Sequence, residues 1–595
     1  EHYVTENSNQ AMAWREMTTT AIRDANPFLY EDPDYPFELP ATVLPYGGFL
    51  ERTTNELNGW DVRLSANYSN VFASDHIVNL FGGMEVNSID RHGTDFTGAG
   101  MQFDMGEVAA FDYRYFKKLQ EGGNQYFFLS NRHDRSAAFF GNATYSYQGK
   151  YTLNGTVRYE GTNRLGKSRT ARWLPTWNVS GSWNIHEEEW MKGLYPTLSH
   201  LSLKASYSLT GDRGPSSVTN SMVVIQAETP YRPFTAVQET GLAIADLANY
   251  ELTYEKKHEL NIGLEAGFFD NRINIVADWY TRENFDLIGP VNTQGIGGGG
   301  ITKLGNSASM HSDGVELSLS STNIKTRDFS WSTSIIYSHS NNVVTKLENV
   351  SRILPMVSGS GFAMQGYPVR SLFSIPFTGL NEEGLPTFIN QDGNPTVSDF
   401  DFQASEPEKL KFLEYSGNVD PTDVGSLGNI FTWKGFKLNV FITYSFGNVV
   451  RLDRVFRSSY SDLDSMPREF ANRWVVPGDE YKTNVPVIAS YWQNVSYAQN
   501  SEYLSRAYNA YNYSSARVAK GDFIRLKEVS LAYDFPQSIS KKLGVNALGL
   551  KLQATNLFLL YADKRLNGQD PEFFNTGGVA LPLAKQFTMT LKIGF

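Results

Sequence analysis

The sequence predicts an all-β protein, a large transmembrane antiparallel β-barrel with long extracellular loops. Three observations lead to this fold class. Apolar and polar residues alternate with a period of two along many segments, aromatic residues make up 14% of the 595 residues, and the connections between segments are either very short or very long. Charged residues reach only 19%, below the roughly 25% of an average soluble domain.

Membrane-spanning helices do not explain this composition. The mean hydropathy is −0.35. The chain also has no uninterrupted apolar run of the about 18 residues that a transmembrane helix requires. Helical membrane proteins are therefore excluded.

The C-terminal segment shows the alternation most clearly. One of its faces carries five apolar side chains, Phe587, Met589, Leu591, Ile593 and Phe595. At about 3.3 Å per residue and a tilt near 45°, the two end rings lie roughly 19 Å apart along the membrane normal, close to the spacing of two aromatic girdles. We expect this terminal strand to present the outward edge that is read during barrel assembly.

The same period recurs in earlier segments, at residues 60–69, 151–160, 259–268, 436–446 and 548–558. A soluble sandwich would instead have short strands with turns about every 8 to 12 residues. These segments are longer, with aromatic residues at both ends of the apolar face, which favours lipid outside and water inside. We expect roughly 16 to 19 strands in this chain.

Some connections are predicted to be tight hairpin turns, at residues 147–151, 269–273 and 433–436. They contain Gly, Asp or Asn, which readily adopt the positive φ that short hairpins require.

Other connections are predicted to be long. They comprise about 40 residues after Asn87, about 40 after Asp212, roughly 40 after Thr387, and about 70 from Val449 to Lys520. The strand assignments around Met222 and Thr378 stay open. Long loops are normal on the outer side of a large barrel.

Charge and cysteine content exclude several classes of protein. The chain has 52 Lys and Arg against 63 Asp and Glu, and 52 − 63 gives a net charge of −11, so no nucleic-acid partner is expected. The absence of cysteine excludes a disulfide scaffold, thiolate metal ligands and cysteine catalysis. No acid, base and nucleophile stand in a pattern that predicts an enzyme.

Three short motifs are weak signals. Residues 295–300 fit G-x-G-x-x-G but lack the preceding strand and following helix of a dinucleotide site, so a flexible loop is predicted. Residues 186–189 read HEEE, not H-E-x-x-H, which indicates a charged rim and not a zinc site. Residues 390–394 alternate oxygen-bearing side chains around a glycine. A type I′ turn at Asp392-Gly393 is favoured there, with a structural calcium ion as the alternative and no other cofactor expected.

Several motifs, in this order, resemble the SusC/RagA-type TonB-dependent transporters of Bacteroidota outer membranes. The first are FGNATYSYQGKYTLNGTVRYEG at 140–161 and WLPTWNVSGSW at 173–183. TYEKKHELNIGL at 253–264 follows, with NRI at 271–273, DWY at 278–280 and DGVEL at 313–317. The C-terminal block is GDFIRLKEVSLAY at 521–533, NLF at 556–558, DPE at 570–572 and the final Phe595.

The resemblance covers the chain from about Gly47 to Phe595. It implies that a complete member has about 22 strands around a plugged lumen. The family's TonB-contacting segment, its globular plug and its first strands have no counterpart here. We therefore assign residues 1–595 to one outer-membrane barrel domain from which the N-terminal plug and first strands are absent.

Charged residues on the polar faces of the strands are candidates for the lumen wall. They are Asp61, Arg63, Arg158, Glu160, Glu259, Glu265 and Asp278. They could guide a solute, or they could hydrate the wall and, by the resemblance, hold a plug. We favour the structural role, because a polar interior is a general property of such barrels.

An aromatic loop is the candidate contact surface for a ligand or a partner protein. Between positions 481 and 513 it contains Tyr481, Tyr491, Trp492, Tyr497, Tyr503, Tyr508, Tyr511 and Tyr513. Just before it, residues 461–474 have the spacing of a short helix. The residues expected to make contacts are Phe470, Trp474, Tyr491, Trp492 and Tyr497. The alternative is that these rings only pack the loops against each other.

The resemblance implies a location in the outer membrane of a Gram-negative bacterium, in contact with lipid and lipopolysaccharide. It also implies a SusD-like surface lipoprotein and, through the plug, TonB as partners, with other envelope proteins as further candidates. The predicted function is TonB-dependent import of oligosaccharides or peptides. The alternative is a non-transporting barrel that acts as a scaffold subunit of an outer-membrane protein complex. Residues upstream of Glu1 would distinguish the two.

Overall fold

The structure, a computed structural model, describes most of the chain. The described residues are 2–7, 29–30, 41–43, 48–102, 108–109, 113–121, 126–215, 223–228, 241–292, 302–348, 352–403, 410–456, 467–499, 503–573 and 584–595. Met222 and residues 295–300, which the sequence singled out, lie outside them.

Within the described residues, one sheet of 17 strands forms the body of the protein. Its strands are β1 (His2–Asn7), β4 (Gly48–Phe72), β5 (His76–Gln102), β6 (Val108–Ala109), β7 (Phe127–Tyr147), β8 (Tyr151–Thr162), β9 (Trp173–Asn184), β10 (Leu198–Asp212), β13 (Glu255–Phe268), β14 (Ile273–Asn292), β15 (Thr302–Lys325), β16 (Phe329–Leu347), β22 (Asp423–Trp433), β23 (Phe436–Phe446), β26 (Phe523–Asp534), β27 (Ala547–Ala562) and β28 (Gln586–Gly594). This number agrees with the roughly 16 to 19 strands predicted for a transmembrane barrel.

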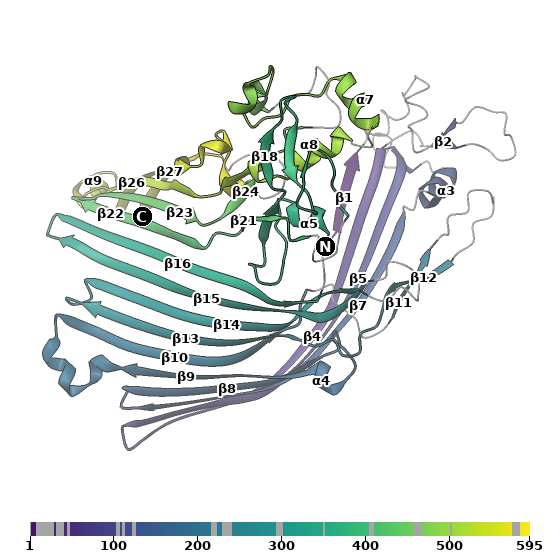
Figure 1. Cartoon of the computed structure of the whole chain (residues 1–595). Coiled ribbons are helices and arrows are strands. Elements are labelled where there is room, and N and C mark those ends of the chain that lie inside the picture. The colour runs from purple at the N-terminus through teal and green to yellow at the C-terminus, as the bar shows by residue number, and fades with distance from the viewer. Residues whose placement is uncertain are drawn as a thin grey trace.

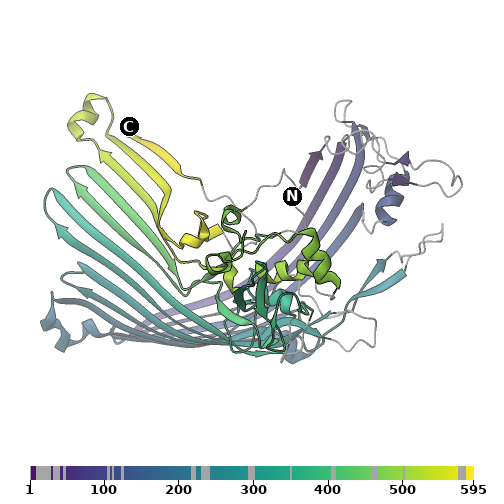
Figure 2. The same cartoon turned by 45° about the horizontal axis from the view of Figure 1, so that its top comes forward.

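The wall strands follow each other as an antiparallel meander. Registers connect β1 to β4, β4 to β5 and β5 to β7, and they continue strand by strand to β27 and β28. The sheet is strongly curved, and the two edges that carry the N- and C-termini face each other across an opening (Figures 1 and 2). The fold is the wall of a large antiparallel β-barrel, which confirms the predicted fold class.

The strand connections differ sharply between the two ends of the wall. At one end, the turn end, most connections reverse the chain within a few residues, and the longer ones after β9 and β26 contain short helices. Positive φ angles occur there at Gln148 and Gly149, at Phe269, Asp270 and Asn271, and at Lys434 and Gly435. These are the three tight turns that the sequence predicts. At the other end, the loop end, long insertions follow β10, β16 and β23.

Two of the predicted long loops are confirmed. Strand β10 ends at Asp212, and the next wall strand begins at Glu255. The connection between β23 and β26 begins with β24 (Val449–Arg451) and ends with β25 (Val518–Lys520), which pair Val449 with Lys520.

Two other loop positions are wrong. Asn87 lies inside β5, paired with Asp61 and Ser136, so the strand continues to Gln102 before the chain leaves the sheet. Polar residues on both faces of this part of β5 hide the period of two. Thr387 lies inside β19 (Pro386–Ile389), in the middle of the connection that follows β16. Thr378 lies in β18 (Phe377–Leu380), which pairs with β19 and not with the wall.

One face of the wall, the outer face, carries many large apolar side chains that are exposed among the described residues. Leu64 is 60% exposed. The same face exposes the large apolar side chains of Trp60, Val62, Leu80, Met84, Phe139, Leu153, Val157, Val179, Leu203, Ile262 and Leu264. Exposed apolar patches on soluble monomers rarely exceed a few hundred Å². A band of this extent fits contact with hydrocarbon.

Aromatic rings border this band on both sides. Near the turn end, Tyr151 stacks on Trp183 and Phe436 packs against Tyr533. Towards the loop end, rings contact each other in the order Trp177, Tyr207, His258 and Phe285. The two rows match the aromatic girdles of transmembrane barrels. No helix among the described residues is long and apolar enough to cross a membrane.

The C-terminal strand forms as the sequence predicts. Leu548, Leu550, Leu552 and Ala554 of β27 lie opposite Ile593, Leu591, Met589 and Phe587 of β28. All four of these β28 side chains and Phe595 are exposed. Their role in barrel assembly stays a prediction.

The register of β23 yields a first prediction. Ile442 lies on the outer face between Leu427 and Leu526. Asn439 lies on the opposite face and donates a hydrogen bond to Glu528. Ile442→Arg should destabilise the folded barrel by about 2 to 4 kcal/mol, the cost of an arginine that faces lipid near the membrane midplane.

Unfolding of the protein by denaturant in lipid vesicles measures this cost. Asn439→Arg is the matched control, because its guanidinium would lie beside the Glu528 carboxylate. A loss of stability as large in the control as in Ile442→Arg would contradict the assignment of the two faces.

Candidate functional site

Two surfaces can contact a solute or a partner. The first is the inner face of the wall, defined by the side chains that alternate with those of the outer face. The second is a body at the loop end, which we call the cap. It is built by the connections that follow β16 and β23.

The inner face carries a network of ion pairs in the first half of the wall. The Arg158 guanidinium contacts both Glu85 and Glu160, at 2.6 Å from Glu160. Arg213, just after β10, donates to the same Glu160 carboxylate. Glu160 therefore lies between two arginines, which connects β5, β8 and the start of a long loop.

Further pairs follow across β10, β13 and β14. Glu259 lies 2.6 Å from the Lys257 ammonium and 3.0 Å from the Arg282 guanidinium. Glu265 contacts Lys204 and lies 3.7 Å from His200. These two carboxylates are thus matched by cations on the same or a neighbouring strand.

The structure places all seven predicted lumen residues on one face. Only Arg158 and Glu160 contact each other directly. Arg63 lies opposite Glu85, and its guanidinium lies 4.9 Å from the Phe140 ring centroid. Asp61 lies opposite Asn87, and Asp278 lies opposite Gly263. A Cβ on Gly263 would come within 2.5 Å of the Asp278 carboxylate, so glycine leaves room for that side chain.

Sequence reasoning missed the partners of these residues. Glu85, Lys204, Arg213 and Arg282 complete the network. Strand period alone would have put Glu85, Lys204 and Arg282 on the inner face. Their pairing depends on cross-strand registers, which only the structure supplies.

The second half of the wall is different, because hydroxyl and amide groups dominate its inner face. A hollow of about 400 Å³ lies there, lined mainly by polar uncharged residues. Its lining includes Asn274, Ser320, Thr322, Ser332, Ser334 and Asn439, with Arg272 as the charged member. The inner face therefore carries ion pairs in its first half and a hollow rich in hydroxyl and amide groups in its second half.

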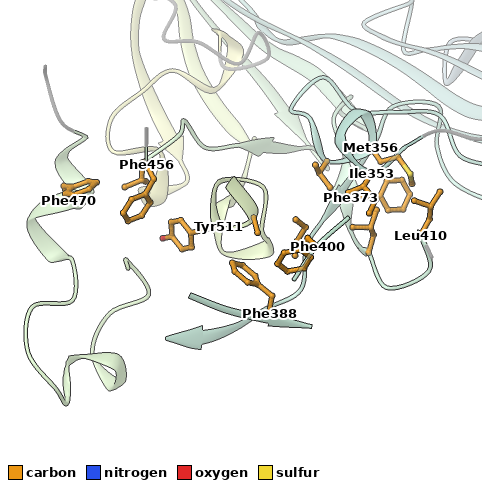
Figure 3. Close-up of a cluster of buried hydrophobic side chains, with 14 residues drawn as sticks. Ile353, Met356, Phe373, Phe388, Phe400, Leu410, Phe456, Phe470 and Tyr511 are labelled. Atoms are coloured by element: carbon orange, nitrogen blue, oxygen red, sulfur yellow. The ribbon is translucent and has the colours of Figure 1, made fainter. Parts of the chain in front are cut away.

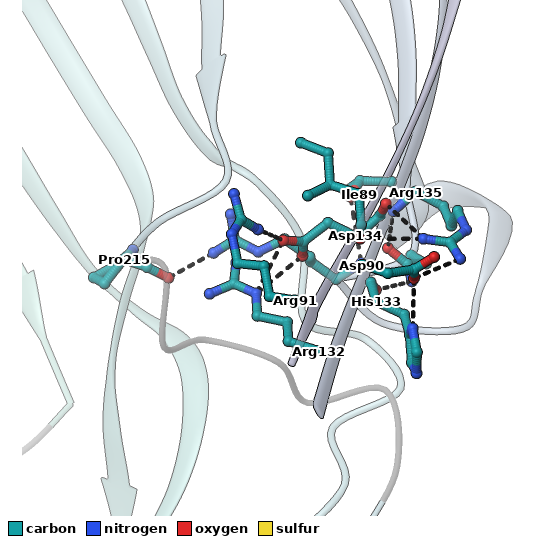
Figure 4. Close-up of polar contacts among 11 residues, drawn as sticks. Ile89, Asp90, Arg91, Arg132, His133, Asp134, Arg135 and Pro215 are labelled. Carbon is teal, nitrogen blue, oxygen red and sulfur yellow. Dashed lines mark hydrogen bonds and ion pairs between the residues drawn. The ribbon is translucent and has the colours of Figure 1, made fainter. Parts of the chain in front are cut away.

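Strands β5 and β7 carry a further charged cluster towards the loop end (Figure 4). Asp134 lies 2.6 Å from Arg91 and 3.0 Å from Arg132. On the opposite face, Asp90 lies 2.7 Å from Arg135 and 2.5 Å from His133. Because successive residues of a strand face opposite sides, the two strands are held together on both faces.

The cap is built from two segments that are distant in the sequence. The first contributes α5 (Ile353–Val357), β17 (Ser371–Ser374), β18, β19, β20 (Pro395–Thr396) and β21 (Glu414–Asn418). The second contributes β24, η5 (Arg468–Asn472), η6 (Asp479–Tyr481), α7 (Tyr491–Gln499), α8 (Leu504–Asn512), η7 (Ser515–Arg517) and β25. Ile375 and Ser514 form a parallel bridge between the two segments.

A shared hydrophobic core makes these segments one body (Figure 3). Its buried side chains are Ile353, Met356, Val357, Phe373, Ile375, Phe388, Phe400, Leu410, Leu413, Val455, Phe456, Phe470, Ala510 and Tyr511. Tyr511 contacts Phe377 of the first segment and Phe456 of the second. Burial raises the pKa of the Tyr511 hydroxyl to about 12. The cap is therefore a packed structure with its own core.

A buried arginine fixes the base of the cap. The Arg451 guanidinium donates to the carbonyl of Ser514 at 2.6 Å, the carbonyl of Phe373 at 2.7 Å and the Ser374 hydroxyl at 3.0 Å. These acceptors come from both segments, and none carries a charge. Burial lowers the pKa of Arg451 to about 9. Nearby, the nearly buried Arg517 forms an ion pair with Glu469.

The predicted contact residues separate into two groups. Phe470 and Trp474 are buried, which corrects their expected place on the contact surface: Phe470 packs in the cap core on Phe456. The Trp474 indole donates to Glu480 at 2.9 Å, and this hydrogen bond lowers the pKa of that carboxyl. For these two rings, the structure supports the alternative prediction, in which the aromatic rings pack the loops against each other. The expected helix at 461–474 is only the short 3-10 helix η5 within the described residues.

Tyr491 and Trp492 are 72% and 76% exposed. They contact each other edge to face on α7, a helix with no buried residue. Tyr497 is partly buried and donates to Glu383 at 3.2 Å. Tyr481, Ile488 and Tyr503 are also exposed. We call Tyr481, Ile488, Tyr491, Trp492 and Tyr503 the aromatic crest of the cap. Side-chain burial, which the sequence does not show, separates the crest from the core.

The two motifs at 390–394 and 186–189 have structural roles. Asn390 Oδ1 accepts from the N–H groups of Asp392 and Asn394, and Gly393 alone of the central pair has a positive φ. The turn is thus confirmed, but type I′ is wrong because it requires positive φ at Asp392 too. His186 Nδ1 donates a hydrogen bond to the Leu201 carbonyl at 3.0 Å. Within the described ranges, no group of three or more His, Cys, Asp and Glu is arranged to hold a metal ion.

Comparison with known proteins agrees with this architecture. A family model described as "TonB dependent receptor-like, beta-barrel" matches residues 8–557. TonB-dependent receptor P3 of Formosa agariphila is 26% identical over 558 residues, which cover 90% of this chain and 51% of that protein. TonB-dependent receptor SusC of Bacteroides thetaiotaomicron is 24% identical over 480 residues, with 76% of this chain and 43% of that protein covered.

The structure of the RagAB peptide transporter superposes with a TM-score of 0.73 at 21% identity, over 95% of this chain and 58% of that one. This likeness shows the fold. The chain spans about half the length of the curated relatives it matches. The relatives named here are receptors and transporters, not enzymes.

The buried arginine of the cap yields a second prediction. Arg451→Met should leave the carbonyls of Ser514 and Phe373 without their donor. Each buried group that loses its partner costs about 1 to 3 kcal/mol. The cap should therefore open more often, while the wall keeps its registers.

Hydrogen exchange at residues 449–451 and 514–520 measures this opening. Arg454→Met is the matched control, because Arg454 is exposed and contacts the exposed side of the cap at the Tyr513 hydroxyl and ring. Unchanged exchange in Arg451→Met would show that the core alone holds the cap.

Proposed function

The chain belongs to the TonB dependent receptor-like β-barrel family, and from this premise we propose that it forms the barrel wall of a SusC-type importer in the outer membrane of a Gram-negative bacterium. The importer takes up oligosaccharides or peptides together with a SusD-like surface lipoprotein, and TonB supplies the energy. The turn end then faces the periplasm, and the cap lies outside the cell.

The contrast between the two faces of the wall carries this proposal. The outer face exposes apolar side chains between two aromatic rows, whereas the inner face carries paired charges and hydroxyl groups. A sheet of this kind separates hydrocarbon from a water-filled or protein-filled interior. Transport across the membrane requires that separation.

A plug is the proposed occupant of the inner face. We assign residues 1–595 to the barrel, with the plug and the first strands supplied by sequence outside these residues. The charged half of the inner face offers hydrogen-bonding groups to a plug. Because Glu160, Glu259 and Glu265 are already matched by cations, a plug could leave without creating unpaired carboxylates. This arrangement suits a plug that must move when TonB acts.

The cap and its aromatic crest are the proposed docking surface for the lipoprotein. Exposed Tyr and Trp side chains bury much apolar area at low entropic cost, and they are enriched among residues that dominate interfaces. A hydrogen bond from Tyr497 of α7 to Glu383 ties the helix that carries Tyr491 and Trp492 to the rest of the cap, which reduces the entropy that binding must overcome.

The cargo class is proposed from relatives. The RagAB structure is that of a peptide transporter by name, and oligosaccharides enter the proposal through the SusC-type resemblance. The hollow in the second half of the inner face, lined mainly by polar uncharged residues, suits neutral polar cargo of either kind.

The crest yields a third prediction. Tyr491→Ala combined with Trp492→Ala should weaken capture of the lipoprotein partner by about ten-fold or more, because truncation of an interface hot spot costs about 2 kcal/mol or more. Co-purification of the partner with the barrel measures the loss. Phe269→Ala, an exposed ring at the turn end, is the control. Undiminished capture would move the docking surface away from the crest.

A fourth prediction concerns the reaction itself. Cells that carry the full-length protein should accumulate labelled oligosaccharides or peptides. Accumulation should fall to the background of a deletion strain when TonB is removed. The scaffold alternative predicts the opposite pattern: deletion would release partner proteins from the outer membrane without changing uptake.

A further inference from the structure

The connection between β9 and β10 is the longest described one at the turn end. It forms two short helices, η2 (Ile185–Glu187) and η3 (Glu189–Leu194). The turn extends past the ends of the two strands (Figure 1). A hairpin between antiparallel neighbours needs only a few residues. The connection is therefore longer than the joining of β9 to β10 requires.

This turn exposes three large side chains. Trp190 is 65% exposed, and Leu194 and Tyr195 are also exposed. Met191 is buried and anchors the helix between them. The exposed side chains thus belong to an ordered turn. Burial of this exposed apolar area against a partner would be favourable, because water disfavours it.

Hydrogen bonds attach the turn to the outer face of the wall. Glu188 accepts from the Tyr151 hydroxyl at 2.5 Å and from the Trp183 indole N–H at 3.2 Å, and it lies 3.4 Å from the Lys150 ammonium. Tyr151 and Trp183 belong to the aromatic row nearest the turn end. Helix η3 therefore begins at the border of the apolar band.

A second turn repeats the pattern on the other half of the wall. Helix α9 (Gln537–Lys542) joins β26 to β27 and exposes Ile539 and Leu543. It follows Tyr533 and Phe535, which contact each other in the same aromatic region. Lys541 and Lys542 end the helix. Two turns with different sequences thus place apolar side chains just beyond the same aromatic row.

We propose that η3 and α9 are interfacial anchors that bind the periplasmic leaflet of the outer membrane. Trp190, Leu194 and Tyr195 on one turn, and Ile539 and Leu543 on the other, enter the headgroup region. This inference rests on the orientation given under Proposed function. Trp and Tyr prefer that depth, since their rings are apolar and their N–H or O–H groups remain hydrated. Lys541 and Lys542 at the end of α9 extend their ammonium groups to lipid phosphates.

The leaflet explains these observations better than a protein partner does. The exposed residues continue the apolar band, and Glu188 connects η3 directly to the aromatic row. A protein partner would have to contact two separate turns that share a level along the wall but no sequence. A bilayer would contact both turns, because they lie at the same level along the wall.

Site-specific labelling tests the proposal, because the 595 residues contain no cysteine. Trp190→Cys and Leu194→Cys each introduce one thiol for a nitrobenzoxadiazole fluorophore. Glu189→Cys and Lys192→Cys are matched controls on the same helix, where both native side chains are exposed and paired with each other. The labelled full-length protein is placed in phospholipid vesicles with shallow or deep spin-labelled lipid, or with iodide in the water.

We expect shallow spin-labelled lipid to quench the labels at 190 and 194 at least about two-fold more than those at 189 and 192. Iodide should show the reverse order. Equal quenching at all four positions would overturn the proposal. Protection at 190 and 194 from both quenchers would overturn it too, because it would reveal a contact between protein copies.

Leu264→Cys separates this proposal from the one on which it rests. Leu264 lies in the apolar band, where the deep spin-labelled lipid should quench its label. Quenching at 264 without quenching at 190 and 194 would leave the membrane barrel intact and remove the anchors. No quenching at 264 would reject the membrane barrel itself.

Discussion

Hydrocarbon offers no hydrogen bonds to a peptide group, and the rest of this structure depends on that constraint. Each unpaired backbone N–H or C=O in a bilayer costs several kcal/mol. The wall meets the demand because each strand pairs with the next one along the chain, in registers with few shifts. Once the backbone is fixed in this way, a side chain can point only to lipid or to the interior. All structural variety is therefore confined to the two ends of the strands and to the inner face.

The same constraint explains how much of the fold could be predicted from the sequence. Strands such as Phe436–Phe446 were predictable because lipid on one side enforces the period of two along their full length. The period fails where the constraint ends. Strand β5 continues to Gln102, and from Asn87 onward polar residues lie on both of its faces. Polar residues on both faces look like a loop, so the sequence predicted one.

The candidate site was harder to predict because its arrangement is non-local. Strand parity placed Arg158 and Glu160 on the inner face, but Arg213, which also pairs with Glu160, lies outside the strands. In the cap, Phe470 and Trp492 look alike as isolated aromatic residues of a polar loop. What separates them is a core shared with a segment that begins near Ile353. Composition shows only that aromatic residues are present. Packing decides which of their side chains remain exposed.

The directions of the two edge strands carry a consequence for the completed wall. Strand β1 runs towards the loop end, since Asn7 lies opposite Phe49 and His2 opposite Thr54. Strand β28 runs towards the turn end, since Gly594 lies opposite Ala547 at the start of β27. The strands that face each other across the opening are thus already opposite in direction. An alternating meander can bridge them only with an even number of additional strands. The parity of the whole cylinder is fixed by geometry, whatever polypeptide closes it.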